Sequence, residues 1–379
     1  MISAKRKICS VLLIVLLLAT LLATMSACNF NNLTNGIEQH KDGMYYTVYL
    51  AKRYAEVHGF DKKEGSQVYE IPSTVKYRWL NIPVKKFSVS SQSNYKIVDG
   101  GAAEELIVPE TLENLDLKSF SISQFESLEK ITVSEKNSQY VSINGVVFTK
   151  DKSTLIFYPP AKTDNTLILP KQTSSISDYL YAKKYLSVIA VEAGNTSYSS
   201  VDGVLFTADG RKIICYPLNK KNETYVIPRS WSVFDTYHFE TNDHLKYLEV
   251  EEGNTVFSAY NGDLYSVDGS ILLYRPKNDN IQVLELPDNV TTISRYTLNY
   301  VKYLYVPAGL QNIVYDISGY NVDINDSNTI ANVDYIYFES EELPFFLRYT
   351  RFKGRVKFGV TREDFKAEIE ARLGNGEQL

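Results

Sequence analysis

Residues 186–217 read LSVIAVEAGNTSYSSVDGVLFTADGRKIICYP, and the same pattern occurs twice more in the chain. The first copy, residues 128–159, reads LEKITVSEKNSQYVSINGVVFTKDKSTLIFYP, and the third, residues 245–276, reads LKYLEVEEGNTVFSAYNGDLYSVDGSILLYRP. The opening leucines are 58 and 59 residues apart, and three sets of marker residues keep that spacing. These sets are Asn137, Asn195 and Asn254; Gly145, Gly203 and Gly262; and Pro170, Pro228 and Pro287. A period of this length predicts a repeat architecture.

Each copy has the same inner pattern. A short strand, such as residues 245–250, precedes a hairpin, which in the second copy joins residues 204–207 to residues 212–216 through Asp209-Gly210. Asp-Gly between apolar runs indicates a hairpin because glycine accepts positive φ. One apolar marker recurs per coil, at Phe120, Leu180, Phe239 and Leu298. Since a single coil cannot bury its own apolar side, we expect a mainly β solenoid of stacked coils. A fourth, degraded copy begins at Val301.

Strands that end in Ile-Pro or Leu-Pro alternate with hairpins that carry the pattern Asn-x-x-Tyr followed by Asp-Gly-x-Leu-Phe. This alternation resembles the BspA-like leucine-rich repeat family of bacterial surface proteins. The residues that carry the resemblance include Ile227-Pro228, Leu286-Pro287, Phe239, Leu245 and Val250. It implies a leucine-rich-repeat solenoid with inserted β-hairpins and irregular coils. It also implies a role in binding host proteins, other cells or surface polymers.

The two ends differ from the repeats. Residues 28–44 are polar and Asn-rich and predict a flexible tether, and residues 45–345 form the predicted repeat domain. Residues 346–379 are predicted to be a C-terminal cap with a short helix. There Thr361 and Asp364 resemble a capping box, and Phe365, Ile369 and Leu373 follow at helical spacing. We expect this helix to cover the last coil, whose edge is otherwise open.

Residues 1–27 have the pattern of an export signal. A basic cluster at residues 5–7 precedes an apolar run and small residues, and Cys28 follows. The end of this segment, residues 25–28, resembles a bacterial lipobox. That resemblance implies cleavage before Cys28 and attachment of fatty acyl chains such as palmitate. We therefore expect a lipid anchor at Cys28 on the extracytoplasmic face of a bacterial cell membrane. Cleavage with release, or an uncleaved anchor helix, are the alternatives.

The composition excludes several classes of function. The chain has 379 residues, with 40 Lys+Arg against 45 Asp+Glu, and this net charge of −5 argues against nucleic-acid binding. Its 4 histidines show no metal-ligand spacing, so we expect no metal site and no cofactor. Residues 323–328 faintly resemble a calcium loop, but the required Gly and Glu are missing. The chain has no catalytic motif, and we expect it not to be an enzyme.

Tyrosines are the candidate contact residues, because Tyr offers rigid area with a polar tip. Among 29 tyrosines, Tyr179 and Tyr305 have no counterpart in the other copies, and Tyr303 would share a strand face with Tyr305. We expect a lipid-anchored surface protein whose solenoid binds an extracellular protein or polysaccharide. The alternatives are a structural envelope lipoprotein without a host ligand, and a glycan-binding accessory protein.

Overall fold

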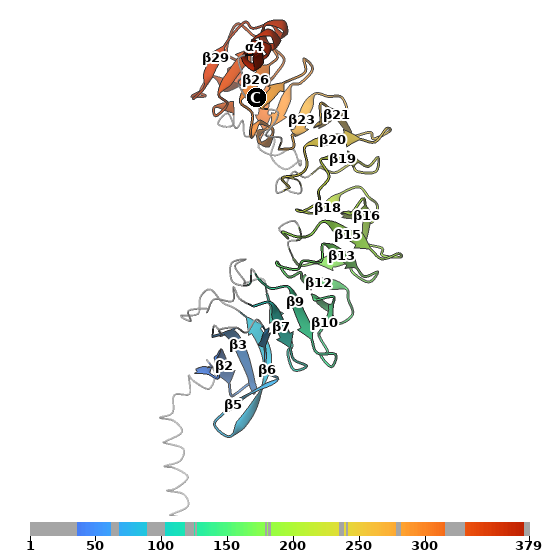
Figure 1. Ribbon diagram of the computed structural model, residues 1–379, viewed down its shortest axis with the longest axis vertical. Coiled ribbons are helices and arrows are strands. Elements are labelled where there is room, and N and C mark those ends of the chain that lie inside the picture. The colour runs from blue at the N-terminus through green and yellow to red at the C-terminus, as the bar shows by residue number, and fades with distance from the viewer. Residues whose placement is uncertain are drawn as a thin grey trace, which may run out of the picture. The chain divides into compact units, whose positions relative to one another are not determined.

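A computed structural model describes residues 36–61, 68–88, 103–117, 125, 127–178, 180, 183–234, 239, 242–277, 282–314 and 330–374. Regular structure in these residues is mainly β, as the repeat pattern predicts. Figure 1 shows these strands along the chain, and residue contacts divide the chain into two compact units. Unit 1 comprises Met1–Lys162 and Ile176–Asp178, and unit 2 comprises Thr163–Ser175 and Tyr179–Leu379.

Unit 1 begins with a sheet in the order β1-β2-β3-β6-β5, and β8 also pairs with β6. Its strands are β1 (Ile37–Lys41), β2 (Met44–Tyr49), β3 (Tyr54–Phe60), β5 (Thr74–Tyr77), β6 (Leu80–Ser88) and β8 (Asn114–Asp116). The predicted tether is therefore wrong from Ile37 onward, because β1 pairs antiparallel with β2. Asp42 and Gly43 form the tight turn between these strands, with φ of 56° and 72°. The polar composition of this stretch gave no indication of the hairpin.

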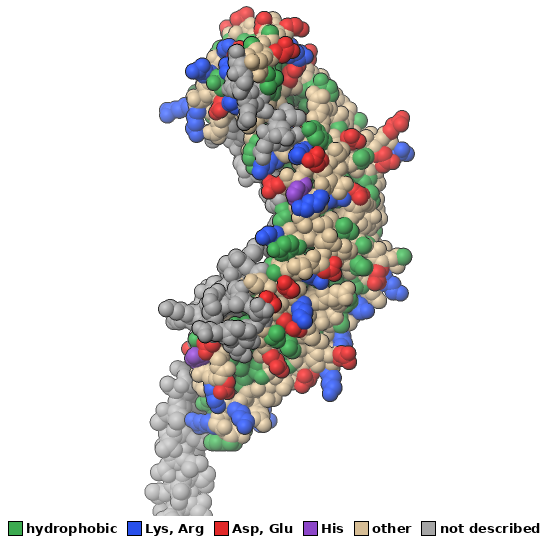
Figure 2. Space-filling view, in the orientation of Figure 1, with side chains coloured by type: hydrophobic (Ala, Val, Ile, Leu, Met, Phe, Trp, Pro, Cys, Tyr) green, Lys and Arg blue, Asp and Glu red, His purple; other side chains and the backbone are tan. Residues whose placement is uncertain are grey.

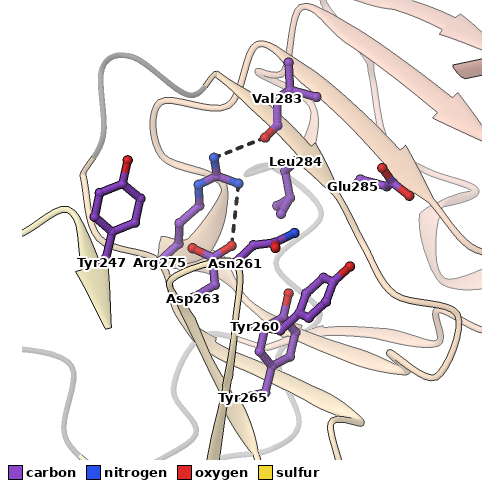
Figure 3. Close-up of a pocket in the computed structure, with 9 residues that line it drawn as sticks. All are labelled: Tyr247, Tyr260, Asn261, Asp263, Tyr265, Arg275, Val283, Leu284 and Glu285. Atoms are coloured by element: carbon purple, nitrogen blue, oxygen red, sulfur yellow. Dashed lines mark hydrogen bonds and ion pairs between the residues drawn. The ribbon is translucent and has the colours of Figure 1, made fainter. Parts of the chain in front are cut away.

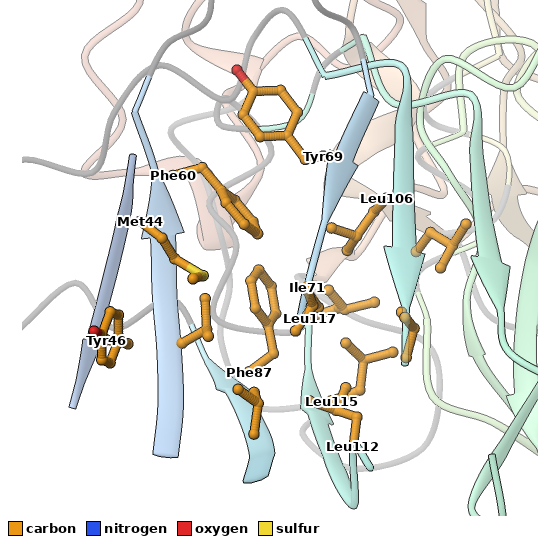
Figure 4. Close-up of a cluster of buried hydrophobic side chains, with 14 of the residues drawn as sticks. Met44, Tyr46, Phe60, Tyr69, Ile71, Phe87, Leu106, Leu112, Leu115 and Leu117 are labelled. Atoms are coloured by element: carbon orange, nitrogen blue, oxygen red, sulfur yellow. The ribbon is translucent and has the colours of Figure 1, made fainter. Parts of the chain in front are cut away.

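The parallel ladder of the repeats starts in unit 1 with β4 (Val68–Glu70), β7 (Glu105–Val108) and β9 (Lys130–Val133). Tyr69, Leu106 and Ile131 occupy matched positions on these three strands, and all three side chains are buried. They join the apolar core shown in Figure 4, which also takes in Phe60 and Phe87 from the first sheet. The first sheet and the start of the parallel ladder thus contribute to one core.

Each of the three complete copies contains a three-stranded antiparallel meander, where the sequence predicted a single hairpin. The strands are β10 (Tyr140–Ile143), β11 (Val146–Thr149) and β12 (Thr154–Phe157); β16 (Tyr198–Val201), β17 (Val204–Thr207) and β18 (Ile213–Cys215); and β21 (Phe257–Tyr260), β22 (Asp263–Ser266) and β23 (Ile271–Tyr274). The predicted Asp-Gly turn joins the second and third strands. An additional turn at the marker glycine joins the first two, with φ of 50° at Asp202 and 76° at Gly203 in the second copy.

Unit 2 holds short parallel sheets between these meanders. They pair β13 (Thr166–Leu169) with β15 (Val188–Val191), and β19 (Thr224–Ile227) with β20 (Tyr247–Val250). Ile176 of β14 (Ser175–Ile176) belongs instead to unit 1, where this strand pairs with β12. The predicted apolar markers Leu180, Phe239 and Leu298 are buried, as expected for stacked coils, whereas Phe120 lies outside the described residues.

The marker asparagines fasten adjacent segments of backbone together. The side-chain amide of Asn195 donates to the carbonyls of Pro170 and Thr173, and its Oδ1 accepts from the backbone N–H groups of Ser197 and Tyr198. Asn137 and Asn254 make the same four bonds in their own copies. The repeated asparagine therefore has a structural role that requires both an amide donor and a carbonyl acceptor.

Replacing Leu186 by alanine should lower the free energy of unfolding by about 2–5 kcal/mol, because this fully buried side chain would leave a cavity. Urea unfolding followed by circular dichroism measures the effect. Val226→Ala is the control, because Val226 is 49% exposed and its truncation should have a much smaller effect. An unchanged midpoint for Leu186→Ala would contradict its assignment to the core.

The C-terminal part of unit 2 contains two further parallel ladders. One is β24 (Val283–Glu285), β26 (Tyr303–Val306), β28 (Tyr335–Phe338) and β29 (Arg355–Lys357), and the other runs from β23 through β25 (Thr292–Ser294) to β27 (Asn312–Val314). Short 3-10 helices form at η5 (Arg295–Leu298) and η6 (Phe345–Leu347). Since β29 pairs with β28, the ladder continues past the predicted domain end at residue 345.

The predicted C-terminal helix is present as α4 (Arg362–Gly374). Thr361 caps it, since its hydroxyl accepts from the Asp364 N–H and also contacts the Asp364 carboxylate. Phe365 and Ile369 are buried, but Leu373 is 52% exposed, which contradicts its expected place on the packed face. The helix packs on the face of β26 and β28 that carries Tyr303, Tyr305 and Tyr337, and its Glu368 also pairs with Lys357 of β29.

Candidate functional site

Two of the predicted site residues, Cys28 and Tyr179, lie outside the described residues. The other two, Tyr303 and Tyr305, do share one face of β26, but that face is buried beneath α4. The Phe365 ring lies 5.4 Å from the Tyr305 ring, and the Arg372 guanidinium lies 5.3 Å from the Tyr303 ring. The expectation that these two tyrosines form an exposed contact surface is therefore wrong, because the amphipathic helix covers them.

Ion pairs hold α4 against the sheet. Arg362 donates to the carboxylates of Glu285 and Asp288 and to the carbonyl of Leu286. Glu368 accepts from the Tyr337 hydroxyl at 2.8 Å and from the Lys357 ammonium. Burial acts to raise the pKa of Glu368, but these hydrogen bonds outweigh it and the pKa falls to about 2.

A different site emerges when the three copies are compared position by position. The third copy departs from the other two at Asp263, where the first two copies have Val146 and Val204, both buried. It departs again at Arg275, where they have Tyr158 and Tyr216. Further departures are Tyr247, at the position of Lys130 and Val188, and Tyr260, at the position of Ile143 and Val201.

These four departures line one cavity of about 550 Å³. It lies where the parallel ladder breaks between β20 and β24, and the Asn261-Gly262 turn borders the gap (Figure 3). In this view Tyr247 lies on one side of Arg275 and Asp263, and Tyr260 on the other. The volume falls within the range of roughly 300–1,000 Å³ that is typical of small-molecule sites.

The cavity exists because two large side chains of the second copy have smaller or polar counterparts in the third. At the corresponding break in the second copy, the Tyr216 and Tyr225 rings pack edge to face at 5.3 Å. The residues at those positions in the third copy are Arg275 and Leu284. Leucine is smaller than tyrosine, and the Arg275 guanidinium turns to the carbonyl of Val283 at 3.2 Å. The third copy thus has open space beside polar groups.

Asp263 and Arg275 form a buried ion pair, with 3.8 Å between Oδ2 and Nη1. Burial raises the pKa of Asp263 to about 6, although the Arg275 charge acts to lower it. The neighbouring Tyr265 is also buried, and burial together with the Asp263 charge raises the pKa of its phenol. Glu285, at the far wall, is neutralised by Arg362 and by Lys366 at 3.3 Å.

A second hollow of about 480 Å³ adjoins the first. Tyr260, Tyr265 and Glu285 line both hollows, and Arg362 and Lys366 from α4 line the second. The two hollows therefore lie next to each other, with Tyr260 in the wall of both. Elsewhere on the visible surface, acidic and basic side chains are interspersed (Figure 2).

The ionisation of Asp263 should make the stability of the protein depend on pH. Because its pKa of about 6 exceeds the unfolded value near 4, the folded state binds the proton more tightly, and stability falls as pH rises from about 4 to about 6. Asp263→Asn removes this dependence. The unfolding free energy of the wild type relative to this variant should fall by up to about 3 kcal/mol between pH 4 and pH 7. A difference that is equal at both pH values would contradict the burial of the carboxylate.

Among the described residues, no group of three or more His, Cys, Asp or Glu side chains is placed to hold a metal ion. Residues 323–328, which faintly resemble a calcium loop, lie outside the described residues. None of the helices in the described part of the chain has the length and hydropathy that a membrane span requires.

Neither a protein-family model nor a curated protein matches the chain. Several bacterial proteins of known structure are similar to the chain. They include the pneumococcal vaccine antigen PcpA, with 19% identity, 89% of this chain and 96% of that chain covered, and a TM-score of 0.43. A leucine-rich cell surface protein from Faecalibacterium prausnitzii has 14% identity, covers 87% and 97%, and has a TM-score of 0.39. A leucine-rich repeat protein from Eubacterium ventriosum has 14% identity, covers 85% and 94%, and has a TM-score of 0.37. At these TM-scores the likeness is distant. The evidence for the repeat fold is therefore the parallel strand pairing and the repeated marker positions of this chain.

The sequence did contain a signal for the cavity. In a repeat protein the register defines what each position ordinarily does, so a charged residue at an apolar register position stands out. Asp263 is such a residue, since valine occupies that position in the other two copies. Arg275 completes the signal, because the gapless register aligns it with Tyr158 and Tyr216. Neither residue is a tyrosine, so a hypothesis based on tyrosines does not include them.

Proposed function

We propose that the chain is a lipid-anchored cell-surface binding protein of a bacterium, and that the third-copy cavity is its binding site. The observation that carries the proposal is the gathering of four departures from the repeat register, at Tyr247, Tyr260, Asp263 and Arg275, around one cavity. Buried charges in place of apolar side chains do not help a copy to fold. A binding role accounts for their presence better than packing does.

The anchor part of the proposal is supported by the basic, apolar and small-residue order of residues 1–27 and by Cys28 at the lipobox position. Two acyl chains hold a protein at a membrane, where one chain gives only marginal binding. The binding role is proposed as non-catalytic, with an extracellular protein or polysaccharide as the partner.

Replacing Cys28 by serine should abolish acylation and move the protein from the membrane to the soluble fraction, because serine has no thiol to modify. Metabolic labelling with a fatty acid and membrane fractionation measure both effects. Cys9→Ser is the matched control, since Cys9 lies in the apolar run of the signal and its replacement should leave the anchor intact. A Cys28→Ser protein that stays in membranes would favour an uncleaved helix, and a soluble wild type would favour release.

The binding role is tested by a variant that carries residues of the second copy at the equivalent positions of the third copy. The triple variant Asp263→Val, Arg275→Tyr and Leu284→Tyr recreates the set Val204, Tyr216 and Tyr225. We expect it to fold and to lose binding of the full-length lipoprotein to arrayed extracellular proteins and surface polysaccharides. Full retention of the wild-type binding pattern would contradict the role of the cavity.

A further inference from the structure

We propose that the third-copy cavity and its adjoining hollow bind a short, uncharged oligosaccharide. This inference rests on the proposed binding role and names the ligand class for that site. Four features of the described residues carry it: the aromatic walls, the polar group between them, the balance of charge and the adjacency of the two hollows.

The aromatic walls suit the apolar faces of sugar rings. Tyr260 is 54% exposed and Tyr247 is 36% exposed, and they border the cavity on two sides (Figure 3). Tyr260 is also held in place, because its ring packs edge to face on the buried Tyr265 ring at 6.4 Å. A pyranose ring presents C–H groups on one face, which pack on an aromatic ring, while the phenol oxygen remains available for hydrogen bonds.

The polar group between the walls suits sugar hydroxyls. Asp263 provides acceptors, Arg275 provides donors, and the side-chain amide of Asn261 provides both. Arg275 is fixed by its bond to the Val283 carbonyl and by its pairing with Asp263. Neighbouring hydroxyls on a sugar each donate and accept, so they match a fixed pair of charged groups that offers both roles.

The balance of charge favours an uncharged ligand. The two hollows are lined by three carboxylates, Asp263, Glu285 and Asp288, and by three cations, Arg275, Arg362 and Lys366. Each of these charges lies in an ion pair within the site. An anionic ligand such as a phosphate or a uronic acid would have to break one of these pairs, whereas hydroxyl groups can bond to them as they stand.

The adjacency of the hollows favours more than one sugar ring. Tyr260 and Tyr265 line both hollows, and the hollow volumes of about 550 Å³ and about 480 Å³ each have room for at least one ring. The main rival is an extended peptide added to the edge of β24. The carbonyl of Val283 at this edge already accepts from Arg275, which removes an acceptor that a peptide strand would need.

The test is calorimetric titration of the full chain, purified in a nonionic detergent without a sugar headgroup. The probes are gluco-, xylo- and N-acetylglucosamine oligosaccharides from mono- to hexasaccharide, uronic acid oligomers as charged counterparts, and a pool of extended peptides. We expect one uncharged series to bind, with affinity rising from monosaccharide to disaccharide. Tyr260→Ala should weaken binding by about tenfold or more, and the triple variant with the second copy's residues should abolish it.

Tyr349→Ala is the matched control, because Tyr349 is 83% exposed and lies outside both hollows. It should bind as the wild type does, and circular dichroism should show that all variants are folded. Failure of every uncharged sugar to bind, preference for uronic acids or peptides, or undiminished binding by the folded triple variant would overturn the inference. Shortening of the oligosaccharides during titration would also overturn it, because the site would then be hydrolytic.

The same proteins separate failure of this inference from failure of the binding role. If no sugar binds but the triple variant loses capture of an arrayed protein, the cavity is a binding site for another class of ligand. If no sugar binds and the triple variant retains every interaction of the wild type, both proposals fail.

Discussion

Replacing Trp231 by alanine should lower the free energy of unfolding by about 3–5 kcal/mol, the range for truncating a large buried aromatic side chain. Trp231 is fully buried in unit 2. Its indole lies 5.4 Å from the Phe257 ring and 5.7 Å from the Phe239 ring, and the Phe206 and Phe234 rings complete its surroundings. Alanine would leave a cavity that these rings cannot fill without moving, and would also remove the indole bond to the Val233 carbonyl.

Urea unfolding followed by circular dichroism measures this loss without relying on tryptophan fluorescence. The chain has only 2 tryptophans, and the other one, Trp79, is the control because it is 82% exposed at a hairpin tip. Trp79→Ala should change the free energy by less than about 0.5 kcal/mol. Similar losses for the two variants would contradict the central place of Trp231 in the core of unit 2.

Replacing Asn137 by alanine should cost a comparable amount, about 3–5 kcal/mol, for a different reason. Asn137 is almost fully buried, and its side chain satisfies the carbonyls of Pro109 and Leu112 and the N–H groups of Gln139 and Tyr140. Alanine would leave these groups without their partner, and each unsatisfied buried group costs about 1–3 kcal/mol, with incomplete additivity.

Asn137→Asp separates the loss of hydrogen bonds from the loss of volume. Aspartate keeps the acceptor but places a second carboxylate oxygen against two carbonyl oxygens, which raises its pKa above that in the unfolded chain. Stability should therefore fall as pH rises through about 4 and above, and recover partly in acid. Denaturation of the variant and the wild type at pH 4 and pH 7 measures this, because Asp263 makes the wild type depend on pH as well. A variant that is destabilised relative to the wild type by the same amount at both pH values would contradict the donor role of the amide.

The repeat fold was predictable because its signals are local and occur three times. Markers such as Gly203 and Asn195 hold register across three copies, so each copy supports the reading of the others. The capping residues of α4 were predictable for the same reason, since Thr361 and Asp364 lie within one helical turn. The first hairpin, at Asp42-Gly43, occurs only once, so no other copy supports it. It was not predicted because the polar composition of the surrounding stretch indicated a flexible tether.

The burial of Tyr305 was not predictable, because the helix that covers it begins at Arg362, far along the chain. Strand alternation correctly placed Tyr303 and Tyr305 on one face, but alternation does not say what lies against that face. The cavity depends on similarly distant residues, since Tyr247, Asp263 and Leu284 come from three strands. The sequence shows that Tyr247 and Asp263 differ from the residues at the same positions in the other copies. It does not show that they line one cavity, because that depends on how the strands are arranged in space.

The breaks in the parallel ladder have a consequence for how such a chain can diverge. Within unit 2, each short parallel sheet joins the end of one copy to the start of the next, because β13 before Pro170 pairs with β15 and β19 before Pro228 pairs with β20. The meanders, in contrast, pair strands of a single copy. A duplicated copy can then accumulate substitutions in its meander without unpairing the strands that it shares with its neighbours. We expect sequence variation among related chains to concentrate in the meanders of single copies rather than to spread evenly over the parallel strands.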